Sequence, residues 1–429
     1  MLTRRSLTAG LGAFAALGSF GARAAAKSIA YWSHNYPSLL SIVDGTMAPG
    51  FQKDSGVTVA HDNFETNELD IKVLTAWVGG GGPDLVSTGD NNLPGYVARK
   101  LVAEVDPVAL GFASLTELID FYEPGALNGY MIDGKLYGIP MDAAALSMYY
   151  RRDLFKEVGL DPDKPPTTWE EVTEYGKRLT KRDASGHIIR AGWGWEARSL
   201  SSHFYYWGAC LPQKGADFLS ADGLKNGFDN DAGISAFQFV YDTFNTSHIS
   251  ALGLAPTVGV IDDFGAGRVA MTNAGFWLSP SLEAQYPKVT YKDGVYGIAR
   301  LPQFSQGKRV TRLNPWVFMV SAQSAQQKEA WQFIGYMTKS RQSQALWLQK
   351  AQYIQPVKGY ADTPEMRAIP FGQIFVKDTS IGVPTPRTPK FNQLATAVAR
   401  AYDEMSGSGT KPEQVVPDLA KRVDRLLRG

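Results

Sequence analysis

Short apolar runs alternate along the chain with longer segments in which apolar residues recur every three or four positions. The short runs predict strands at residues 28–32, 57–60, 83–87 and 144–150. The periodic segments predict helices over residues 68–78, 168–179, 232–245, 324–337 and 412–427. Because strands and helices follow one another in this way, we expect parallel strands joined by crossovers and an α/β fold.

Several helix starts carry side chains that can accept hydrogen bonds from free backbone N–H groups. Thr168 and Glu171 have the spacing of a capping box, and so do Ser324 and Gln327. Asn67 stands where it can cap the helix expected from residue 68. These caps predict where the three helices begin.

The first 26 residues have the three parts of an export signal. Arg4 and Arg5 precede an uncharged stretch rich in Ala, Leu and Gly, and three alanines then offer a cleavage site. This stretch is shorter than the ~20 residues that cross a bilayer, so we expect cleavage and a mature chain from about Lys27. The start resembles a twin-arginine signal. Thr8 stands where such signals usually have Lys, which leaves the general secretory route open.

Charge and cysteine content narrow the class of protein. Without the three arginines of the signal, 40 basic residues stand against 42 acidic ones, so no basic excess favours nucleic acid. The single cysteine, Cys210, forms no intramolecular disulfide and lies among aromatic residues, where we expect it to be buried. No cysteine stands at the signal junction to carry a lipid. We therefore expect a soluble, monomeric protein of the periplasm.

The mature chain of about 400 residues exceeds what one hydrophobic core usually serves, so we expect two lobes. No flexible linker separates two independent halves, which predicts that the chain weaves between the lobes. Aromatic residues are plentiful, with 10 Trp among them. Such rings suit a ligand with flat apolar faces.

Motifs for catalysis or cofactor binding are missing from the sequence. The glycines at 79–82 lack the Lys-Ser/Thr of a phosphate loop and predict a helix-to-strand connection. The five histidines have no metal-ligand spacing, so we expect no metal and no cofactor. Two alternatives stay open: an exported carbohydrate-active enzyme, and a binder of metal or polyamine. For ferric iron the candidates are Tyr205 and Tyr206 beside His203.

Seven segments between about residues 30 and 360 carry a family resemblance. They are GPDLV at 82–86, DGKLYGIP at 133–140, YYRRDLF and PTTWEE within 149–171, FGAGRVAM at 264–271, GIARLP at 297–302 and AWQFI at 330–334. In this order and behind an export signal, they resemble the family 1 extracellular solute-binding proteins of ABC importers. That family includes the maltose and glycerol-3-phosphate binders.

The resemblance implies a two-lobed periplasmic-binding-protein fold with interwoven lobes and a cleft that closes about a hinge. One lobe would comprise residues 27–142 with about 300–350, and the other residues 147–298 with about 356–429. The protein would capture a sugar, oligosaccharide or polyol without catalysis. It would then deliver this solute to the transmembrane subunits of an ABC permease.

Candidate ligand contacts follow from residue chemistry and from positions at expected strand ends and crossings. They are Trp32, His34, Asp90, Asn91, Asp142, Trp277 and Trp316. Trp277 would stack on a sugar face while Asp90, on the opposite wall, accepts hydroxyl hydrogen bonds; core packing is the alternative for each Trp. Asp90 and Asp142 argue against an anionic ligand, because like charges in a dry cleft are costly. Arg198 and Arg268 would reverse this if they pointed inward.

Overall fold

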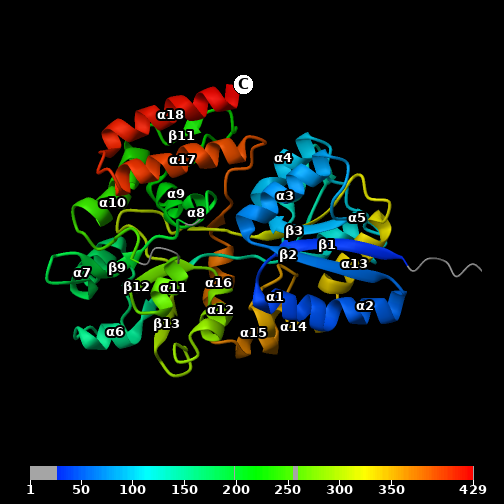
Figure 1. Ribbon diagram of the computed structural model, residues 1–429, viewed down its shortest axis with the longest axis horizontal. Coiled ribbons are helices and arrows are strands. Elements are labelled where there is room, and N and C mark those ends of the chain that lie inside the picture. The colour runs from blue at the N-terminus through cyan, green and yellow to red at the C-terminus, as the bar shows by residue number, and fades with distance from the viewer. Residues whose placement is uncertain (1–26, 198, 255–258, 429) are drawn as a thin grey trace, which may run out of the picture.

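The computed structural model describes residues 27–197, 199–254 and 259–428, which form two α/β lobes lying side by side (Figure 1). Each lobe is built around one five-stranded sheet with helices packed about it. The predicted α/β class and two-lobed architecture are confirmed. The expected export signal lies outside the described residues. Within the described ranges, none of the helices combines the length and the apolar character needed to cross a bilayer.

The sheet of the first lobe has the strand order β2-β1-β3-β15-β6. Its strands are β1 (Ser28–His34), β2 (Thr58–Phe64), β3 (Leu85–Gly89), β6 (Ile139–Pro140) and β15 (Trp316–Val320). Its helices are α1 (Pro37–Ile42), α2 (Ala48–Ser55), α3 (Thr66–Val78), α4 (Leu93–Ala98), α5 (Leu115–Phe121), α13 (Gln327–Thr338) and α14 (Arg341–Ala351). Strand β1 pairs in parallel with β2 and β3, as predicted, whereas β15 runs antiparallel to β3 and β6.

The sheet of the second lobe has the strand order β13-β7-β12-β9-β8. Its strands are β7 (Ser147–Arg151), β8 (Lys181–Arg182), β9 (Ile188–Gly194), β12 (Val269–Ala274) and β13 (Tyr296–Ala299). Strands β9 and β12 are parallel, and β7 runs antiparallel to β12 and β13.

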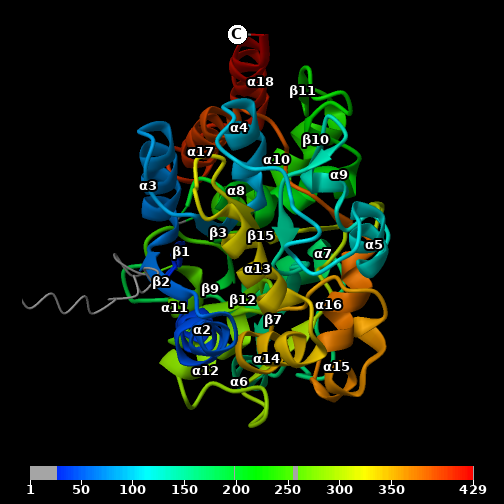
Figure 2. The ribbon, with the colours of Figure 1, turned by 90° about the vertical axis from the view of Figure 1, so that its right-hand side faces the viewer.

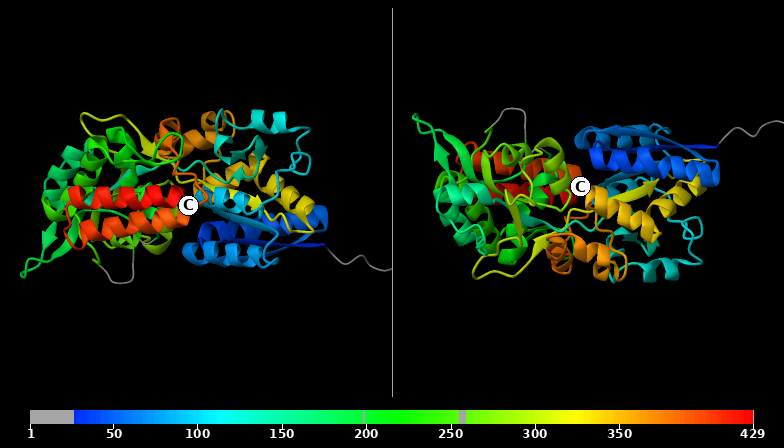
Figure 3. Two further views of the ribbon diagram at one scale, coloured as in Figure 1. Left: turned by 90° about the horizontal axis from the view of Figure 1, so that it is seen from above. Right: turned by 90° about the horizontal axis from the view of Figure 1, so that it is seen from below.

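Helices of varied length surround the second sheet. They are α6 (Arg152–Glu157), α7 (Trp169–Leu179), α8 (Ser202–Tyr205), α9 (Cys210–Lys214), α10 (Asp231–Asn245), α11 (Val260–Gly265), α12 (Leu278–Gln285), α17 (Phe391–Ser406) and α18 (Pro412–Arg428). Helices α17 and α18 pack against each other on the outer side of this lobe (Figure 2 and Figure 3). Cys210 is fully buried among the aromatic residues of this lobe, as predicted.

The local sequence signals located most elements but not every helix start. The capping box of α7 is confirmed, because the backbone N–H of Glu171 donates to the Thr168 hydroxyl at 3.1 Å. The box predicted at residue 324 is wrong: α13 begins at Gln327, and the Ser324 hydroxyl donates to Asp84 at 2.6 Å instead. The cap predicted at Asn67 is also wrong, because α3 already begins at Thr66. The Ser324 hydroxyl also accepts from the backbone N–H of Gln326 at 2.9 Å, so it holds a local turn before the helix and a partner distant in sequence at once.

The glycine run at 79–82 is a helix-to-strand connection, as predicted. Gly80 and Gly82 have φ of 81° and 97°, a left-handed backbone that favours glycine. A Cβ on Gly82 would also lie 2.7 Å from the Cβ of Ala76. These glycines therefore serve the turn between α3 and β3.

Three passages of chain join the lobes: the first at residues 141–146, the second at 300–315 and the third at 352–390. Ala145 of the first passage forms an antiparallel bridge with Leu313 of the second. The third passage carries the short helices α15 (Pro364–Ala368) and α16 (Gly372–Thr379). The predicted lobe boundaries stay a prediction. The two sheets show to which lobe each strand belongs, but they do not assign the segments between the strands to either lobe.

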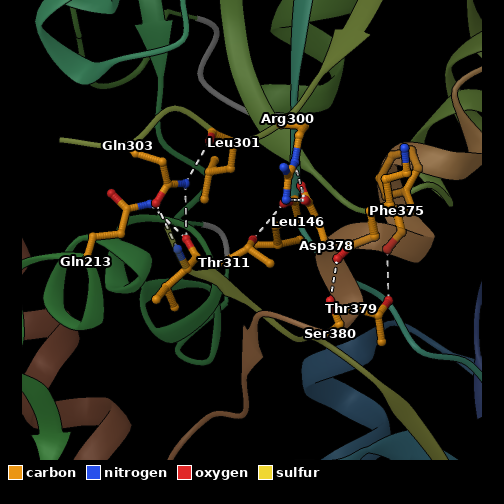
Figure 4. Close-up of polar contacts among 12 residues, drawn as sticks. Leu146, Gln213, Arg300, Leu301, Gln303, Thr311, Phe375, Asp378, Thr379 and Ser380 are labelled. Carbon is orange, nitrogen blue, oxygen red and sulfur yellow. Dashed lines mark hydrogen bonds and ion pairs between the residues drawn. The ribbon is translucent and has the colours of Figure 1, made fainter. Parts of the chain in front are cut away.

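Hydrogen bonds pair the passages with one another. Strand β14 (Thr311–Arg312) of the second passage runs parallel to β16 (Gly382–Val383) of the third. The Thr311 hydroxyl donates to the carbonyl oxygen of Leu146 at 2.6 Å, where the first passage meets β7 (Figure 4). All three passages are thereby held together at one place.

Two arginines of the second passage strengthen this junction. Arg312 is fully buried, forms an ion pair with Asp217 and donates to the carbonyl oxygen of Pro384 at 2.8 Å. Arg300 forms an ion pair with Asp378 of α16, seen in Figure 4. Buried charges are stable only when paired and hydrogen-bonded, so these contacts specify how the passages sit together.

Candidate ligand-binding site

A cavity of about 640 Å³ lies between the two lobes. Its aromatic lining consists of His34, Tyr36, Tyr205, Tyr206, Trp277, Trp316 and Tyr353. Its polar lining includes Glu65, Asp70, Asn91, Glu196, Ser199, Ser202, Asp262, Ser281, Gln285 and Asn314. The volume falls within the ~300–1,000 Å³ range of pockets that enclose small organic ligands.

The cavity lies where parallel strands end. His34 ends β1, Glu65 follows β2, and Gly89 ends β3, so the first wall comes from the carboxyl ends of three parallel strands. On the second wall, Glu196 follows β9 and Trp277 follows β12, which are also parallel. Ligands of open α/β sheets bind at such carboxyl ends.

Stacked rings support Trp316 on the first wall. The ring centroids of His34 and Trp316 are 3.8 Å apart, and Tyr36 lies 5.8 Å from His34 with nearly parallel planes. Burial lowers the pKa of His34 to about 3, so its ring is neutral near pH 7 and packs as an aromatic group. Trp316 keeps part of its surface exposed in the cavity.

Trp277 comes from the opposite lobe and is likewise partly exposed in the cavity. Its ring packs against Gly275, where a Cβ would collide with the indole nitrogen. The Tyr36 hydroxyl donates to the Trp277 carbonyl oxygen at 2.9 Å, which joins the two walls. Two tryptophans thus reach one cavity from different lobes.

The structure brings together only part of the predicted set of ligand contacts. The residues that line the cavity are His34, Asn91, Trp277 and Trp316. The residues that do not line it are Trp32, Asp90 and Asp142. Trp32 instead meets the edge of Phe64, with ring centroids 5.1 Å apart, and packs against the core of the first lobe.

The Asp90 side chain is fully buried beside the cavity rather than exposed on its wall. Arg387, from the third passage, donates to Asp90 at 2.8 Å. Burial raises the pKa of Asp90, and the Arg387 cation partly offsets that rise. The guanidinium lies where a Cβ at Gly129 would collide with it. Asp90 therefore ties a strand end to the third passage.

Asp142 lies buried in the first passage and accepts a hydrogen bond from the backbone N–H of Trp316 at 2.7 Å. Burial raises the pKa of Asp142 to about 7, with the hydrogen bond from Trp316 opposing the rise and the nearby charge of Asp90 adding to it. This carboxyl group therefore positions the strand that carries Trp316.

Most polar residues of the cavity are absent from the predicted set of ligand contacts. Glu65 and Asp70 are among them, although the end of β2 and the start of α3 are positions that could indicate them. Tyr205 and Tyr206 belong to the prediction only as an alternative for iron. The Tyr205 hydroxyl in fact donates to Asn91 of the opposite lobe at 2.9 Å.

The structure gives little support to a metal ligand or to arginines that point into the cavity. His203 does not line the cavity, and its Nδ1 accepts a hydrogen bond from Trp207 at 3.1 Å. Over the described ranges, no three His, Cys, Asp or Glu side chains are grouped to hold a metal ion. Arg268 pairs with Asp263 at 2.7 Å away from the cavity lining, and Arg198 lies outside the described residues.

Two α/β lobes, three paired passages and a polar-aromatic cavity between the lobes define a ligand-binding protein of the hinged, two-lobed class. Residues 36–344 match the family described as bacterial extracellular solute-binding protein. The chain belongs to this family. The predictions of a family 1 solute-binding protein and of binding without catalysis are confirmed.

Relatives and solved structures agree with this assignment. The sn-glycerol-3-phosphate-binding periplasmic protein UgpB of Pectobacterium atrosepticum is 24% identical over 96% of this chain and 94% of the relative. A solute-binding protein of Thermotoga lettingae bound with α-D-tagatose has a TM-score of 0.82 at 20% identity, covering 94% of this chain and 100% of that one. A maltose/maltodextrin-binding domain of Bdellovibrio bacteriovorus bound to maltotriose has a TM-score of 0.78 at 21% identity, with the same coverage.

Replacing Tyr205 by Phe should open the ligand-free protein, because the hydroxyl bond to Asn91 crosses between the lobes. A buried hydrogen bond of this kind contributes ~0.5–1.5 kcal/mol. Small-angle X-ray scattering should show a larger radius of gyration than in wild type. Tyr402→Phe is the control, since its buried hydroxyl has no hydrogen-bond partner within the described residues. Equal radii for the two variants would contradict the prediction.

Replacing Asp142 by Asn should stabilise the protein at pH 8 relative to wild type but not at pH 4. The folded carboxyl group has a pKa of about 7 against an ordinary value of 3.8, so the folded state holds a proton that the unfolded state releases. Wild type therefore loses stability as the pH rises from about 4 to about 7. An amide oxygen still accepts from Trp316. Melting temperatures at both pH values test this, with the exposed Asp62→Asn as control; a pH-independent difference would refute it.

Proposed function

We propose that this protein captures a carbohydrate, meaning a sugar, oligosaccharide or polyol, and delivers it to the transmembrane subunits of an ABC permease. The observation that carries the proposal is the pair Trp277 and Trp316, which face one cavity from opposite lobes. Indole rings provide broad apolar area for the C–H faces of a sugar. The carboxylates, amides and hydroxyls around them can bind its hydroxyl groups.

The geometry supports capture by closure of the lobes. A ligand that contacts both walls binds the closed state better than the open one and shifts the population toward it. Delivery then follows when the closed form meets the permease. The ligands bound in similar structures, tagatose and maltotriose, support a carbohydrate as the solute.

The proposed compartment is the periplasm, reached through the signal in residues 1–26. The support is the charged start, the short apolar stretch and the alanines that end it, together with the extracellular family. N-terminal sequencing of the exported protein should give a start near Lys27. Recovery of a chain that keeps Met1 in the membrane fraction would refute this.

A carbohydrate ligand at 100 times its Kd should stabilise the fold by ~2.7 kcal/mol, seen as a rise in melting temperature across a ligand panel.

Trp316→Ala should weaken binding of the carbohydrate at least about tenfold, because a loss of ~1.4 kcal/mol of contact free energy suffices. Trp331→Phe is the control: this Trp is buried in the core, so stability should fall while calorimetric affinity is unchanged.

Other outcomes of the panel would replace the proposal. Stabilisation by ferric ion alone would favour the site at Tyr205 and Tyr206. Stabilisation by polyamines or amino acids, with no response to carbohydrates, would assign a different solute class. Chemical turnover of a sugar would indicate an enzyme.

A further inference from the structure

Carboxylates stand on both walls of the cavity. They are Glu65 and Asp70 from the first lobe, and Glu196 and Asp262 from the second. Within the described lining there is no Lys or Arg, and burial keeps the His34 ring uncharged near pH 7. The first wall therefore presents the negative charge of Glu65 and Asp70 to the cavity.

Asp70 is the carboxylate for which the contacts are best defined. It lies on α3, and its Oδ1 accepts a hydrogen bond from the Thr88 hydroxyl at 2.6 Å. Asn92 in turn donates to that hydroxyl at 3.1 Å, so the groups behind Asp70 are neutral. Burial raises the pKa of Asp70 to about 6, and side-chain hydrogen bonding from Thr88 and Asn92 only partly opposes the rise. Among the residues that the structure describes, no cation pairs with Asp70.

Asp70 also acts across the cavity. Burial raises the pKa of Tyr205 on the second wall, and the charges of Asp90 and Asp70 add to that rise. Asp90 has its own cation in Arg387, whereas Asp70 lines the cavity itself. An anionic solute would meet this uncompensated charge in a region of low dielectric constant, and a cation would relieve it.

We propose that Asp70 sets the charge selectivity of the cavity, so that it prefers a saccharide with a protonated amino group over a neutral sugar and rejects a sugar phosphate. The inference rests on the proposed carbohydrate ligand. The ammonium group would form a charge-assisted hydrogen bond with the Asp70 carboxylate, which is stronger than one from a hydroxyl group. A phosphate group would instead be repelled by that carboxylate.

The test is calorimetry on the mature protein at pH 7.5 with charge series of related sugars. The probes are glucosamine, glucose and glucose 6-phosphate, the matching galactose series, and the β-1,4 trimers of glucosamine and glucose. We expect the amino sugar to bind at least about tenfold more tightly than its neutral partner, and the phosphate to bind most weakly. Asp70→Asn should reduce the amino-to-neutral preference to less than about threefold.

Glu68→Gln is the matched control, because Glu68 lies on the same helix, is exposed and pairs with Lys72 away from the cavity. It should leave the preference unchanged. Neutral sugars that bind wild type as tightly as amino sugars would overturn this inference and leave the proposed function standing. If no carbohydrate binds at all, the proposed function is overturned, and the inference falls with it. The order in which wild type binds the amino, neutral and phosphorylated sugars tests the inference even if Asp70→Asn folds poorly.

Discussion

The pairing of the three passages is the constraint on which the cavity depends. Each wall is built from one sheet. The walls face each other because Ala145, Leu313 and the strands β14 and β16 join the passages, and hydrogen bonds from Tyr36 and Tyr205 then link the walls directly. Short paired strands permit rotation of one lobe against the other but resist sliding. Trp316 follows the second passage directly, so any rotation there moves a cavity wall.

Buried charge reinforces this arrangement. Asp90 and Arg387 join the end of β3 to the third passage, and Asp142 joins the first passage to the backbone of Trp316. Placing such groups in the interior costs free energy, so they contribute more to a defined geometry than to net stability. The same low dielectric constant that makes the burial costly makes the cavity sensitive to the charge of a solute.

Sequence signals predicted local structure correctly where only residues close in sequence determine the conformation. The capping box at Thr168 and the glycine turn before β3 formed as predicted, because both are settled within a few residues. Ser324 shows the limit: its hydroxyl bonds to Asp84, which is 240 positions away in the sequence. The same limit applies to Asp90, since nothing near it in the chain indicates that Arg387 will neutralise it.

The sequence by itself determined the α/β class, the family and the positions of His34, Asn91, Trp277 and Trp316 near strand ends. These follow from periodicity and motifs, which are properties of short stretches of chain. Only the tertiary structure decided which polar groups line the cavity and which form ion pairs behind it. The physical reason is that burial and pairing depend on segments that meet only when the three passages bring the lobes together.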